Sequence, residues 1–458
     1  MAGRIDDAEV LARALTYALR EGAFESAGVL AERLLPQLQR VTDTARARAL
    51  EDVLEALVTL GDRPRAVALA RQNPSLIDSW RGSTLLALLG LSDGRDWLPG
   101  GRPDFVALSR RIDLGLLQAS GLRSIVASRP WSWLLYPELH LLAFAAAGSR
   151  DRRRGLLSLN RFLARHGLPA LALCVPAIAS DNILAELVPS AVTRRVSGGT
   201  LVSIVVAARN ARATIGYALQ SLVTQTYSEL EILVCDDASD DGTLALLREF
   251  RRTDARVRAF RSLKQQGAYN VRNALAGRAR GELLTFHDSD DLALPTRIAQ
   301  QVQQLREGGA SACVGSLVRL RPGGTIVFHK DQKATRLSLV TLMLHRHSFL
   351  ELQGFRSVHF GGDWELYVKL RASLGPTRFH RIVAPLMLGL CSSGSATRRL
   401  HSEALEDGYR SPARRLYSEM VLAEQGLAPA PSAVALAACL RASGNYAEPA
   451  EVVELGPD

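Results

Sequence analysis

The pattern of apolar and polar positions changes near residue 196 of this 458-residue chain. Up to about residue 195, apolar and small residues recur at spacings of three and four, with glycine breaks such as Gly22 and Gly61. This spacing places one apolar stripe on each predicted helix, and a proline near a helix start, such as Pro64, is tolerated. Residues 1–195 are therefore predicted to form an all-α domain, either tetratricopeptide-like repeats or an irregular bundle.

Residues 196–405 show a different pattern, in which β-branched runs alternate with amphipathic segments. This alternation predicts an α/β domain built on a mostly parallel, doubly wound sheet. Ligands of such sheets bind beyond the carboxyl ends of the strands. Strands are expected at 201–208, 229–237, 256–262, 281–288 and 311–320, and helices at 212–224, 242–252, 268–279 and 294–307.

After about residue 405 the pattern is helical again. The stretch PSAVALAACLRASGNYAEPAEVVEL, 431–455, repeats the order of helix, glycine break and helix. Residues 406–458 are therefore predicted to form a C-terminal helical hairpin. The predicted domains are 1–195, 196–405 and 406–458, an ordinary number for a chain of this length.

Composition narrows the class of protein. The 56 Lys and Arg residues exceed the 46 Asp and Glu residues, and the formal net charge is +10. Because the basic residues are nearly all arginines scattered through Ala- and Leu-rich helices, no nucleic-acid partner is expected. The densest basic run, SRDRRRG at 149–155, is interpreted as a solvated loop, although weak attraction to anionic lipid or phosphorylated substrates stays open.

The chain is expected to be cytoplasmic. No apolar run approaches the roughly 18 residues of a membrane span, and the acidic residues near the N-terminus do not suit a secretory signal. The five cysteines are far apart and form no CxxC pair, which suits a reducing compartment. Peripheral association with the inner face of the plasma membrane remains compatible with this composition.

Polar side chains gather where three strands of the predicted sheet end. The carboxyl ends of parallel strands meet in one crevice, so residues about 80 positions apart in the chain are expected to converge. These side chains are Asn210 after the first strand, Asp236 and Asp237 at the end of the second, and Asp288, Asp290 and Asp291 after GELLTFH.

The loop DSDD crowds three carboxylates into four residues. Two unit charges about 4 Å apart repel by roughly 4 kcal/mol at an effective dielectric near 20. Mg²⁺ or Mn²⁺ would relieve this repulsion, because hard cations take oxygen ligands from one or two carboxylates and from substrate phosphates. Asp288 and Asp290 are the candidate ligands of a cation that stabilises a leaving diphosphate. The alternative is a solvated turn and helix cap, where Asp is common.

These segments together resemble the family 2 glycosyltransferases, which have the GT-A fold. The resemblance rests on VSIVVAARNARATIGYALQSLVTQTYSELEILVCDDASDDGT and GAYNVRNALAGRARGELLTFHDSDDLALPTRI, over about residues 201–300 and more weakly to 400. It includes the S-x-x-x-Q-T-Y stretch, the DD-x-S-x-D-x-T strand end, the x-R-N helix and the D-x-D-D loop. It implies an inverting, metal-dependent transferase that moves a sugar from a nucleotide-diphosphate donor, expected to be UDP-linked, to a glycan or lipid-linked acceptor in cell-surface polysaccharide biosynthesis.

The resemblance also implies roles for single residues. Asp237, with Asp236 beside it, would contact the base of the nucleotide. Arg272 of the x-R-N helix would lie near the diphosphate or the base. In the D-x-D pair, Asp290 would be the more direct metal ligand and Asp288 its partner.

Two further segments match the family less well. Before Asn210 the family often carries Pro or Thr and then Tyr, whereas this chain has Ala207 and Arg209, so contacts of this loop to the base are in doubt. The polar stretch CSSGSATRR, 391–399, corresponds to a segment that can close over the diphosphate in the family, but it suits a linker equally well. Its candidate residues are Ser395, Thr397 and Arg398.

The stretch HFGGDWELYVKLRASLG, 359–375, carries Asp363 and Glu365 at a predicted helix start, after two glycines. Direct displacement of the diphosphate needs a group that accepts the proton of the acceptor hydroxyl. The family carries an acidic pair here, usually Glu-Asp, and Gly362 replaces the first acid. The resemblance therefore implies Asp363 as the base and Glu365 as a supporting acid, while Asp363 as a simple N-cap is the alternative.

Two other functions stay open. A helical-repeat scaffold or carbohydrate-binding protein with a degenerate transferase domain is one, although intact Asp288, Asp290 and Asp363 argue against it. A nucleotidyltransferase is the other, but it normally has a Gly-rich phosphate loop, which AARNARAT lacks. The helical ends could bind a protein partner, orient a polymeric acceptor or mediate self-association.

Overall fold

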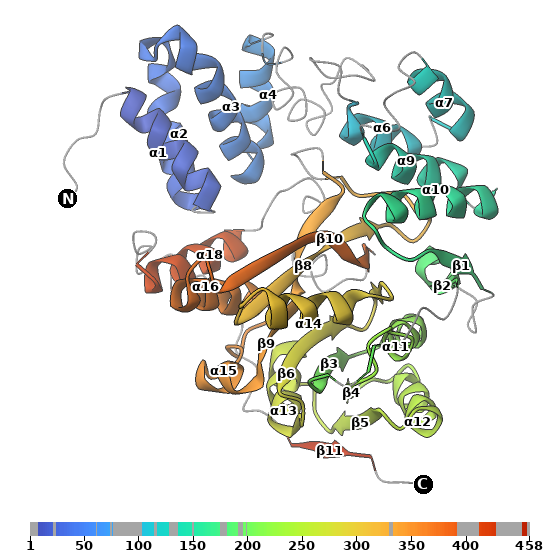
Figure 1. The fold of residues 1–458 in the computed structure, drawn as a ribbon. Coiled ribbons are helices and arrows are strands. Elements are labelled where there is room, and N and C mark those ends of the chain that lie inside the picture. The colour runs from blue at the N-terminus through green and yellow to red at the C-terminus, as the bar shows by residue number, and fades with distance from the viewer. Residues whose placement is uncertain are drawn as a thin grey trace. The chain divides into compact units, whose positions relative to one another are not determined.

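The chain divides into two compact units in the computed structural model (Figure 1). The first comprises Met1–Leu114, Phe328–Lys333 and Ser393–Ser443, and the second Gly115–Val327, Ala334–Ser392 and Gly444–Asp458. The domain boundaries predicted at residues 195 and 405 stay a prediction. The structure describes residues 8–21, 24–60, 62–73, 76, 103–113, 117–127, 136–148, 151–174, 181–190, 196–197, 199–328, 333–391, 412–426 and 451–455.

The elements described in the first unit are helices, as the spacing of apolar residues predicts. Each buries one stripe, for example Leu11 and Leu15 on the first helix. Pro64 stands in the first turn of its helix, which Asp62 caps by accepting a hydrogen bond from the Arg65 N–H at 3.2 Å. Whether these helices form tetratricopeptide-like repeats stays a prediction. They are α1 (Ala8–Glu21), α2 (Phe24–Leu34), the 3-10 helix η1 (Leu35–Arg40), α3 (Asp43–Leu60), α4 (Arg63–Gln72), α6 (Phe105–Asp113) and α18 (Pro412–Glu424).

The second unit begins with helices and a small hairpin. Its helices are α7 (Ala119–Ala127), α9 (Glu138–Ala147) and α10 (Arg152–Arg165). The hairpin pairs β1 (Leu171–Leu173) with β2 (Leu187–Pro189), and the 3-10 helix η4 (Ile183–Glu186) precedes β2. Among the described residues, no helix is both long and apolar enough to cross a lipid bilayer.

A nine-stranded sheet forms the centre of the second unit, in the order β11-β5-β4-β3-β6-β9-β8-β10-β7. Strands β3 to β6 pair in parallel, β9 is antiparallel to β6 and β8, and β10 is parallel to β8. The strands are β3 (Val202–Ala208), β4 (Leu230–Asp237), β5 (Val257–Ser262), β6 (Leu283–Asp288), β7 (Leu292–Ala293), β8 (Ala312–Leu320), β9 (Thr335–His345), β10 (Phe379–Leu390) and β11 (Val452–Glu454).

Helices cover both faces of this sheet, which confirms the predicted α/β class. One apolar core contains buried residues of α11 (Ile215–Val223), α12 (Thr243–Thr253) and α14 (Arg297–Glu307). The other contains residues of α13 (Ala268–Arg278), α15 (Arg346–Glu351) and α16 (Gly362–Leu374). Strands β3 to β6 and their helices follow the predicted order, whereas the half of the sheet after β6 mixes parallel and antiparallel pairs.

Strand β11 differs from the sequence prediction. Its residues lie in the stretch 431–455 that was predicted to be helical, but Val452, Val453 and Glu454 pair antiparallel with β5. Val452 is buried and Val453 is 44% exposed, the alternation of an edge strand. The open edge of β5 offers backbone hydrogen bonds that a local pattern cannot reveal. The rest of the predicted hairpin, 427–450, lies outside the described residues.

Candidate active site

The carboxyl ends of β3, β4 and β6 lie side by side. In the sheet register Ala208 stands opposite Asp236 of β4, and Ala207 stands opposite Asp288 of β6. The two acidic strand ends therefore flank β3, as expected for parallel strands. Ala207 itself is partly exposed between them.

Asp237 and Asp236 at the end of β4 have different surroundings. Asp237 is buried, and its two carboxylate oxygens accept hydrogen bonds from the N–H groups of Gln266 and Gly267, both at 2.8 Å. Burial raises the pKa of Asp237, and these two hydrogen bonds oppose that shift. Asp237 thus holds the turn into α13. One oxygen of Asp236 accepts a bond from the Ser239 N–H at 3.4 Å, whereas Oδ1 is buried without a hydrogen-bond partner among the described residues.

Helix α13 contacts two other acidic residues of the predicted site. The guanidinium of Arg272 pairs with Oδ1 of Asp288 and lies over the ring of Tyr269, 5.7 Å from its centroid. One turn earlier, the Tyr269 hydroxyl donates a hydrogen bond to Oδ1 of Asp363 at 3.0 Å. Together with the contact of Asp237 to the start of the helix, α13 therefore joins acidic residues from three distant parts of the chain.

The acidic loop after β6 contains two carboxyl groups with raised pKa values. Burial and the neighbouring Asp288 carboxylate raise the pKa of Asp290 to about 7, and Arg319 opposes this. Burial, together with Asp290 and Asp288, raises the pKa of Asp291 well above its usual range. Oδ1 of Asp291 accepts a hydrogen bond from the Leu390 N–H at 2.9 Å, so this carboxyl group ties the loop to β10.

Asp288 and Asp290 fit a divalent cation through their chemistry. Both offer carboxylate oxygens, and Asp290 is in a crowded acidic site where a cation would favour its charged form. In the part of the chain that the structure describes, no three His, Cys, Asp or Glu side chains are grouped to hold a metal ion by themselves. Mg²⁺ commonly takes only one or two carboxylates and completes its shell with substrate phosphates and water.

The two acidic residues of α16 differ in their contacts. Gly361 is the N-cap of α16, so the alternative that Asp363 serves as the cap is wrong. Oδ1 of Asp363 accepts bonds from Tyr269 and from the Trp364 N–H at 2.9 Å, and Oδ2 accepts none from the described residues. Glu365 is buried, and its carboxylate forms ion pairs with Lys369 at 2.6 Å and Arg356 at 3.1 Å.

Asn210 links the loops after β3 and β4. Its backbone is left-handed, with φ of 48°, and its N–H donates to Ser239 Oγ at 2.9 Å. Its side-chain oxygen accepts a bond from the Asp240 N–H at 3.1 Å. The other predicted binding residues, Ser395 and Thr397, lie outside the described residues.

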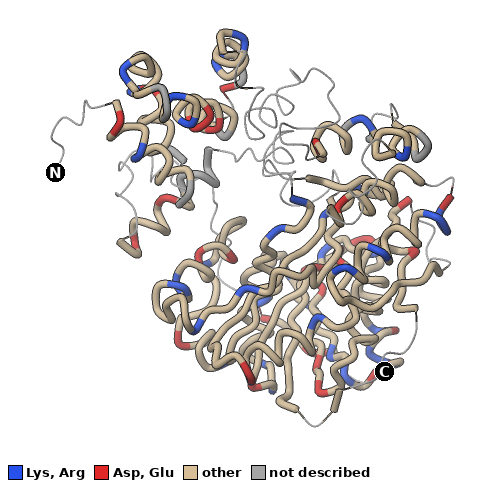
Figure 2. The backbone as a smooth tube through the Cα atoms, turned by 45° about the horizontal axis from the view of Figure 1, so that its top comes forward, with Lys and Arg blue, Asp and Glu red and all other residues tan. Residues whose placement is uncertain are grey.

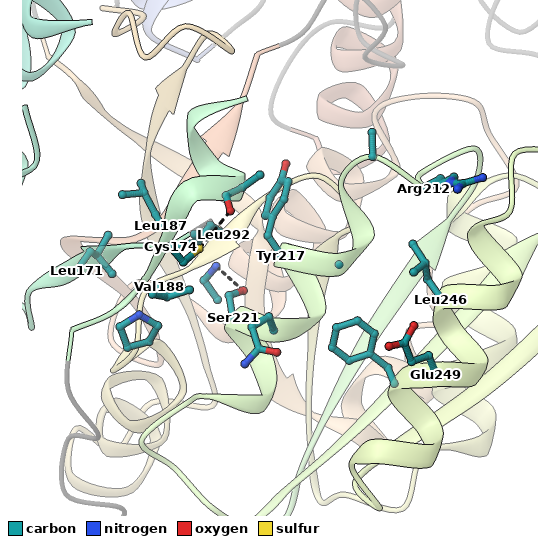
Figure 3. A pocket seen from close by; sticks show the side chains of 17 residues that line it. Leu171, Cys174, Leu187, Val188, Arg212, Tyr217, Ser221, Leu246, Glu249 and Leu292 are labelled. Carbon is teal, nitrogen blue, oxygen red and sulfur yellow. Dashed lines mark hydrogen bonds between the residues drawn. The ribbon is translucent and has the colours of Figure 1, made fainter. Parts of the chain in front are cut away.

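A mainly apolar cavity of about 310 Å³ lies among the β1–β2 hairpin, α11, α12 and β7 (Figure 3). Tyr217 of α11 lines it. The Tyr217 hydroxyl donates to the main-chain oxygen of Asp290 at 2.6 Å and accepts a bond from Asn182 Nδ2 at 2.9 Å. The wall of this cavity therefore supports the acidic loop.

Sequence reasoning missed several residues around the site. Tyr269 and Tyr217 were absent from the predicted set, as were His287 and Arg297, which are buried behind the acidic loop. Tyr269 had a usable signal, because it lies three positions before Arg272 and so shares a helix face with it. The others resemble ordinary core positions in the sequence.

Comparisons with known proteins match the central part of this chain. Residues 203–364 match the family described as Glycosyl transferase family 2. The Escherichia coli UDP-Glc:alpha-D-GlcNAc-diphosphoundecaprenol beta-1,3-glucosyltransferase WfaP is 36% identical over 102 residues, which are 22% of this chain and 40% of WfaP. The succinoglycan biosynthesis protein ExoO of Rhizobium meliloti (strain 1021) is 34% identical over 160 residues, which are 34% of this chain and 44% of ExoO.

The chain therefore spans less than half the length of either relative. Among solved structures, S. aureus TarS 1-349 in complex with UDP-GlcNAc is 17% identical, with a TM-score of 0.40 over 51% of this chain and 69% of that one. Residues 203–364, which include the parallel strands β3 to β6 and their helices, therefore resemble glycosyl transferase family 2.

Proposed function

We propose that the chain is an inverting glycosyltransferase that moves a sugar from a UDP-linked donor to a glycan or lipid-linked acceptor in cell-surface polysaccharide biosynthesis. The observation that carries the proposal is the meeting of Asp237, Asp288 and Asp363 around the start of α13. A UDP-sugar donor and a lipid-diphosphate acceptor are named in the description of WfaP, which supports both substrate classes.

The end of β4 is the proposed site for the nucleotide base. Asp237 already accepts two backbone hydrogen bonds from the turn before α13. Asp236 keeps Oδ1 without a hydrogen-bond partner among the described residues. A buried acceptor without a donor is costly, and the ring N–H of uracil would supply one. We therefore assign the base contact to Asp236, with Asp237 holding the adjacent turn.

The diphosphate is proposed to lie over the acidic loop. Asp290, with Asp288 beside it, would hold Mg²⁺ or Mn²⁺ together with diphosphate oxygens. When bound, the cation supplies positive charge that stabilises the departing diphosphate. Arg272 is joined to Asp288 and adds a fixed positive charge at the same strand end.

Asp363 is the proposed catalytic base. Its Oδ1 is occupied by Tyr269 and Trp364, which leaves Oδ2 for the acceptor hydroxyl. In one displacement the acceptor oxygen bonds to the anomeric carbon, the bond from that carbon to the diphosphate breaks, and the hydroxyl proton passes to Asp363. Attack opposite the leaving group inverts the anomeric configuration.

Helix α10 is the proposed contact with the anionic inner face of the membrane, where lipid-linked acceptors reside. Arg153, Arg154 and Arg161 are exposed on it, around Leu157, which is 59% exposed. Elsewhere in this unit basic and acidic residues are interspersed along the chain (Figure 2). Sedimentation with phosphatidylglycerol vesicles should fall when Arg153 and Arg161 are replaced by Glu, and unchanged sedimentation would contradict this contact.

Transfer assays with a panel of nucleotide sugars test the proposed function. The wild-type protein should release nucleotide from one UDP-sugar in the presence of Mn²⁺, and should be stabilised thermally by that donor. Asp363→Asn should keep the thermal shift and lose about 10²- to 10⁴-fold in transfer, the range typical of a general base. Asp181→Asn removes an exposed carboxylate elsewhere in the unit and serves as the control. Donor binding without turnover would instead support a degenerate, non-catalytic domain.

A further inference from the structure

We propose that Tyr269 is a positioning residue that holds the carboxylate of Asp363, and that position 362 is glycine because the ring of Tyr269 occupies the space beside it. The inference rests on the proposed function, in which Asp363 is the base. It adds a residue on another helix that controls how this base is presented to the acceptor hydroxyl.

Tyr269 and Gly362 are in close contact. A Cβ atom added to Gly362 would lie 3.2 Å from three atoms of the Tyr269 ring, tighter than nine in ten real Cβ contacts. Backbone conformation does not demand this glycine, because the φ angle of Gly362 is not positive, whereas the N-cap Gly361 has φ of 80°. The missing side chain therefore makes room for the tyrosine.

The ring of Tyr269 is held in place from other sides. It packs against Phe355 with 5.1 Å between centroids, and Arg272 lies over it. Phe355 is itself fixed to α13, because its N–H donates to Asn273 Oδ1 at 2.9 Å and its oxygen accepts from Asn273 Nδ2 at 2.8 Å. The hydroxyl therefore has a defined direction towards Asp363.

The hydroxyl acts as a donor at every working pH. Burial, and then the charge of Asp363, raises the pKa of Tyr269 far above its usual range, so the phenol keeps its proton. A hydrogen bond donated to a carboxylate favours its charged form, which is the form that accepts a proton. Because the bond falls on Oδ1, it also orients the carboxylate so that Oδ2 is available.

Tyr269→Phe tests this role, since it keeps the ring and removes only the hydroxyl. We expect kcat to fall about 10- to 100-fold, as for loss of a hydrogen bond to a charged group, with the KM for the donor within about twofold. The control is Tyr227→Phe, which removes a hydroxyl that donates to the Thr200 oxygen at 2.7 Å and should leave kcat and the KM unchanged.

Gly362→Ala provides a second, independent variant. Its methyl group should displace the ring and weaken the same hydrogen bond, although alanine suits a helix better than glycine. Both changes act on one contact, so their effects should not add. The kcat of the double variant, Tyr269→Phe with Gly362→Ala, should be at most about twofold lower than that of the slower single variant. Additive losses would overturn the assigned relation between the two positions.

A substrate-free measurement separates this inference from the proposed function. The carboxyl carbon of Asp363, identified in ¹³C spectra by its loss in Asp363→Asn, should change its chemical shift in Tyr269→Phe, because the hydrogen bond to Oδ1 is removed. An unchanged chemical shift would overturn the inference even in an active enzyme. A changed chemical shift in a protein that turns over no donor would support the inference and refute the proposed function. The substitution leaves unchanged the Arg272 guanidinium over the ring, and Glu365 of α16 with its ion-pair partners Lys369 and Arg356.

Discussion

Arg297 donates a hydrogen bond to Nδ1 of His287 at 2.8 Å, and both side chains are fully buried where α14 meets β6. A guanidinium can only donate, so Nδ1 must be the acceptor and the proton of the neutral imidazole is on Nε2. Nε2 then donates to the main-chain oxygen of Asp291 at 3.1 Å. Burial and the charge of Arg297 lower the pKa of His287 well below its usual range, which maintains this neutral form. The pair thus anchors the acidic loop from behind.

Replacing this histidine should weaken both the fold and the site. His287→Leu leaves Arg297 and the Asp291 oxygen each without one partner, and unsatisfied buried groups cost about 1 to 3 kcal/mol. Urea unfolding should show that loss, and donor binding should weaken with it. His347 is exposed, so His347→Leu should change stability by less than about 0.5 kcal/mol. Equal effects of the two substitutions would contradict the anchoring role.

Asp290 should make stability fall as pH rises when no metal is present. Its folded pKa of about 7 lies above the value near 3.9 expected in the unfolded chain. Between these values the folded state binds more protons than the unfolded state, so the free energy of unfolding decreases with increasing pH. With a chelator present, Tm should therefore decrease between pH 5.5 and 7.5, and Asp290→Asn should flatten this decrease.

Divalent cations should have the opposite effect at the same site. Mn²⁺ favours the charged carboxylate, so the Tm of the wild type should gain more from Mn²⁺ at pH 8 than at pH 5.5. Asp181→Asn should behave as the wild type in both series, because this carboxylate is exposed. A gain from Mn²⁺ that persists in Asp290→Asn would rule out this residue as a ligand.

Substitutions of Asp363 and Glu365 should have different effects, the first on the rate of transfer and the second on the free energy of unfolding. Glu365→Gln removes the charge that pairs with Lys369 and Arg356 and should reduce the free energy of unfolding by about 1 to 3 kcal/mol. Asp363→Asn should leave stability nearly unchanged while transfer is lost. Unfolding curves and kcat should be measured on the same preparations of the two variants. A Glu365→Gln protein of normal stability without activity would assign chemistry to Glu365.

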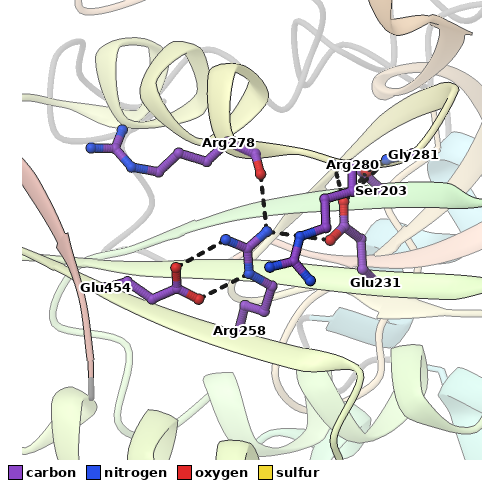
Figure 4. Close-up of polar contacts among 7 residues, drawn as sticks. All are labelled: Ser203, Glu231, Arg258, Arg278, Arg280, Gly281 and Glu454. Atoms are coloured by element: carbon purple, nitrogen blue, oxygen red, sulfur yellow. Dashed lines mark hydrogen bonds and ion pairs between the residues drawn. The ribbon is translucent and has the colours of Figure 1, made fainter.

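The far end of the sheet should contribute stability without affecting catalysis. Glu231 is buried there and accepts bonds from Ser203 Oγ and the N–H of Gly281, while Arg258 pairs with it and with Glu454 of β11 (Figure 4). Glu231→Ala should cost about 1 to 3 kcal/mol because it leaves buried donors unpaired. Glu454 is 44% exposed in its side chain, so Glu454→Ala should cost below about 1 kcal/mol.

The contribution of Glu454 to the free energy of unfolding should also depend on pH, and it should decrease as the pH falls. The hydrogen bond from Arg258 lowers the folded pKa of Glu454, so this contribution is present above the unfolded value of 4.5 and is lost as pH falls through the folded value. Acid unfolding of Glu454→Ala should therefore begin from a lower stability at neutral pH and converge with the wild type at low pH. Glu231→Ala and Glu454→Ala should both keep the wild-type kcat, and a fall in kcat would show coupling across the sheet.

Local patterns in the chain were enough to predict the parallel strands, their helices and the acidic strand ends. β-branched runs, strand-ending carboxylates and the loop DSDD are short-range features, and parallel pairing alone brings Asp236 and Asp288 to one edge of the sheet. For this reason Asp237, Asp288 and Asp290 could be identified as site candidates from the sequence, whereas Asp363 was implied by the family resemblance.

Contacts between distant segments had no such signal. The hydrogen bond from Tyr269 to Asp363 spans 94 positions, and the pairing of Arg258 with Glu454 spans 196. The neutral tautomer of His287 depends on burial beside Arg297, and β11 is a strand because the edge of β5 lies open to it. Hydrogen bonding and burial of this kind arise from packing in three dimensions, so they became visible when the helices and strands were assembled.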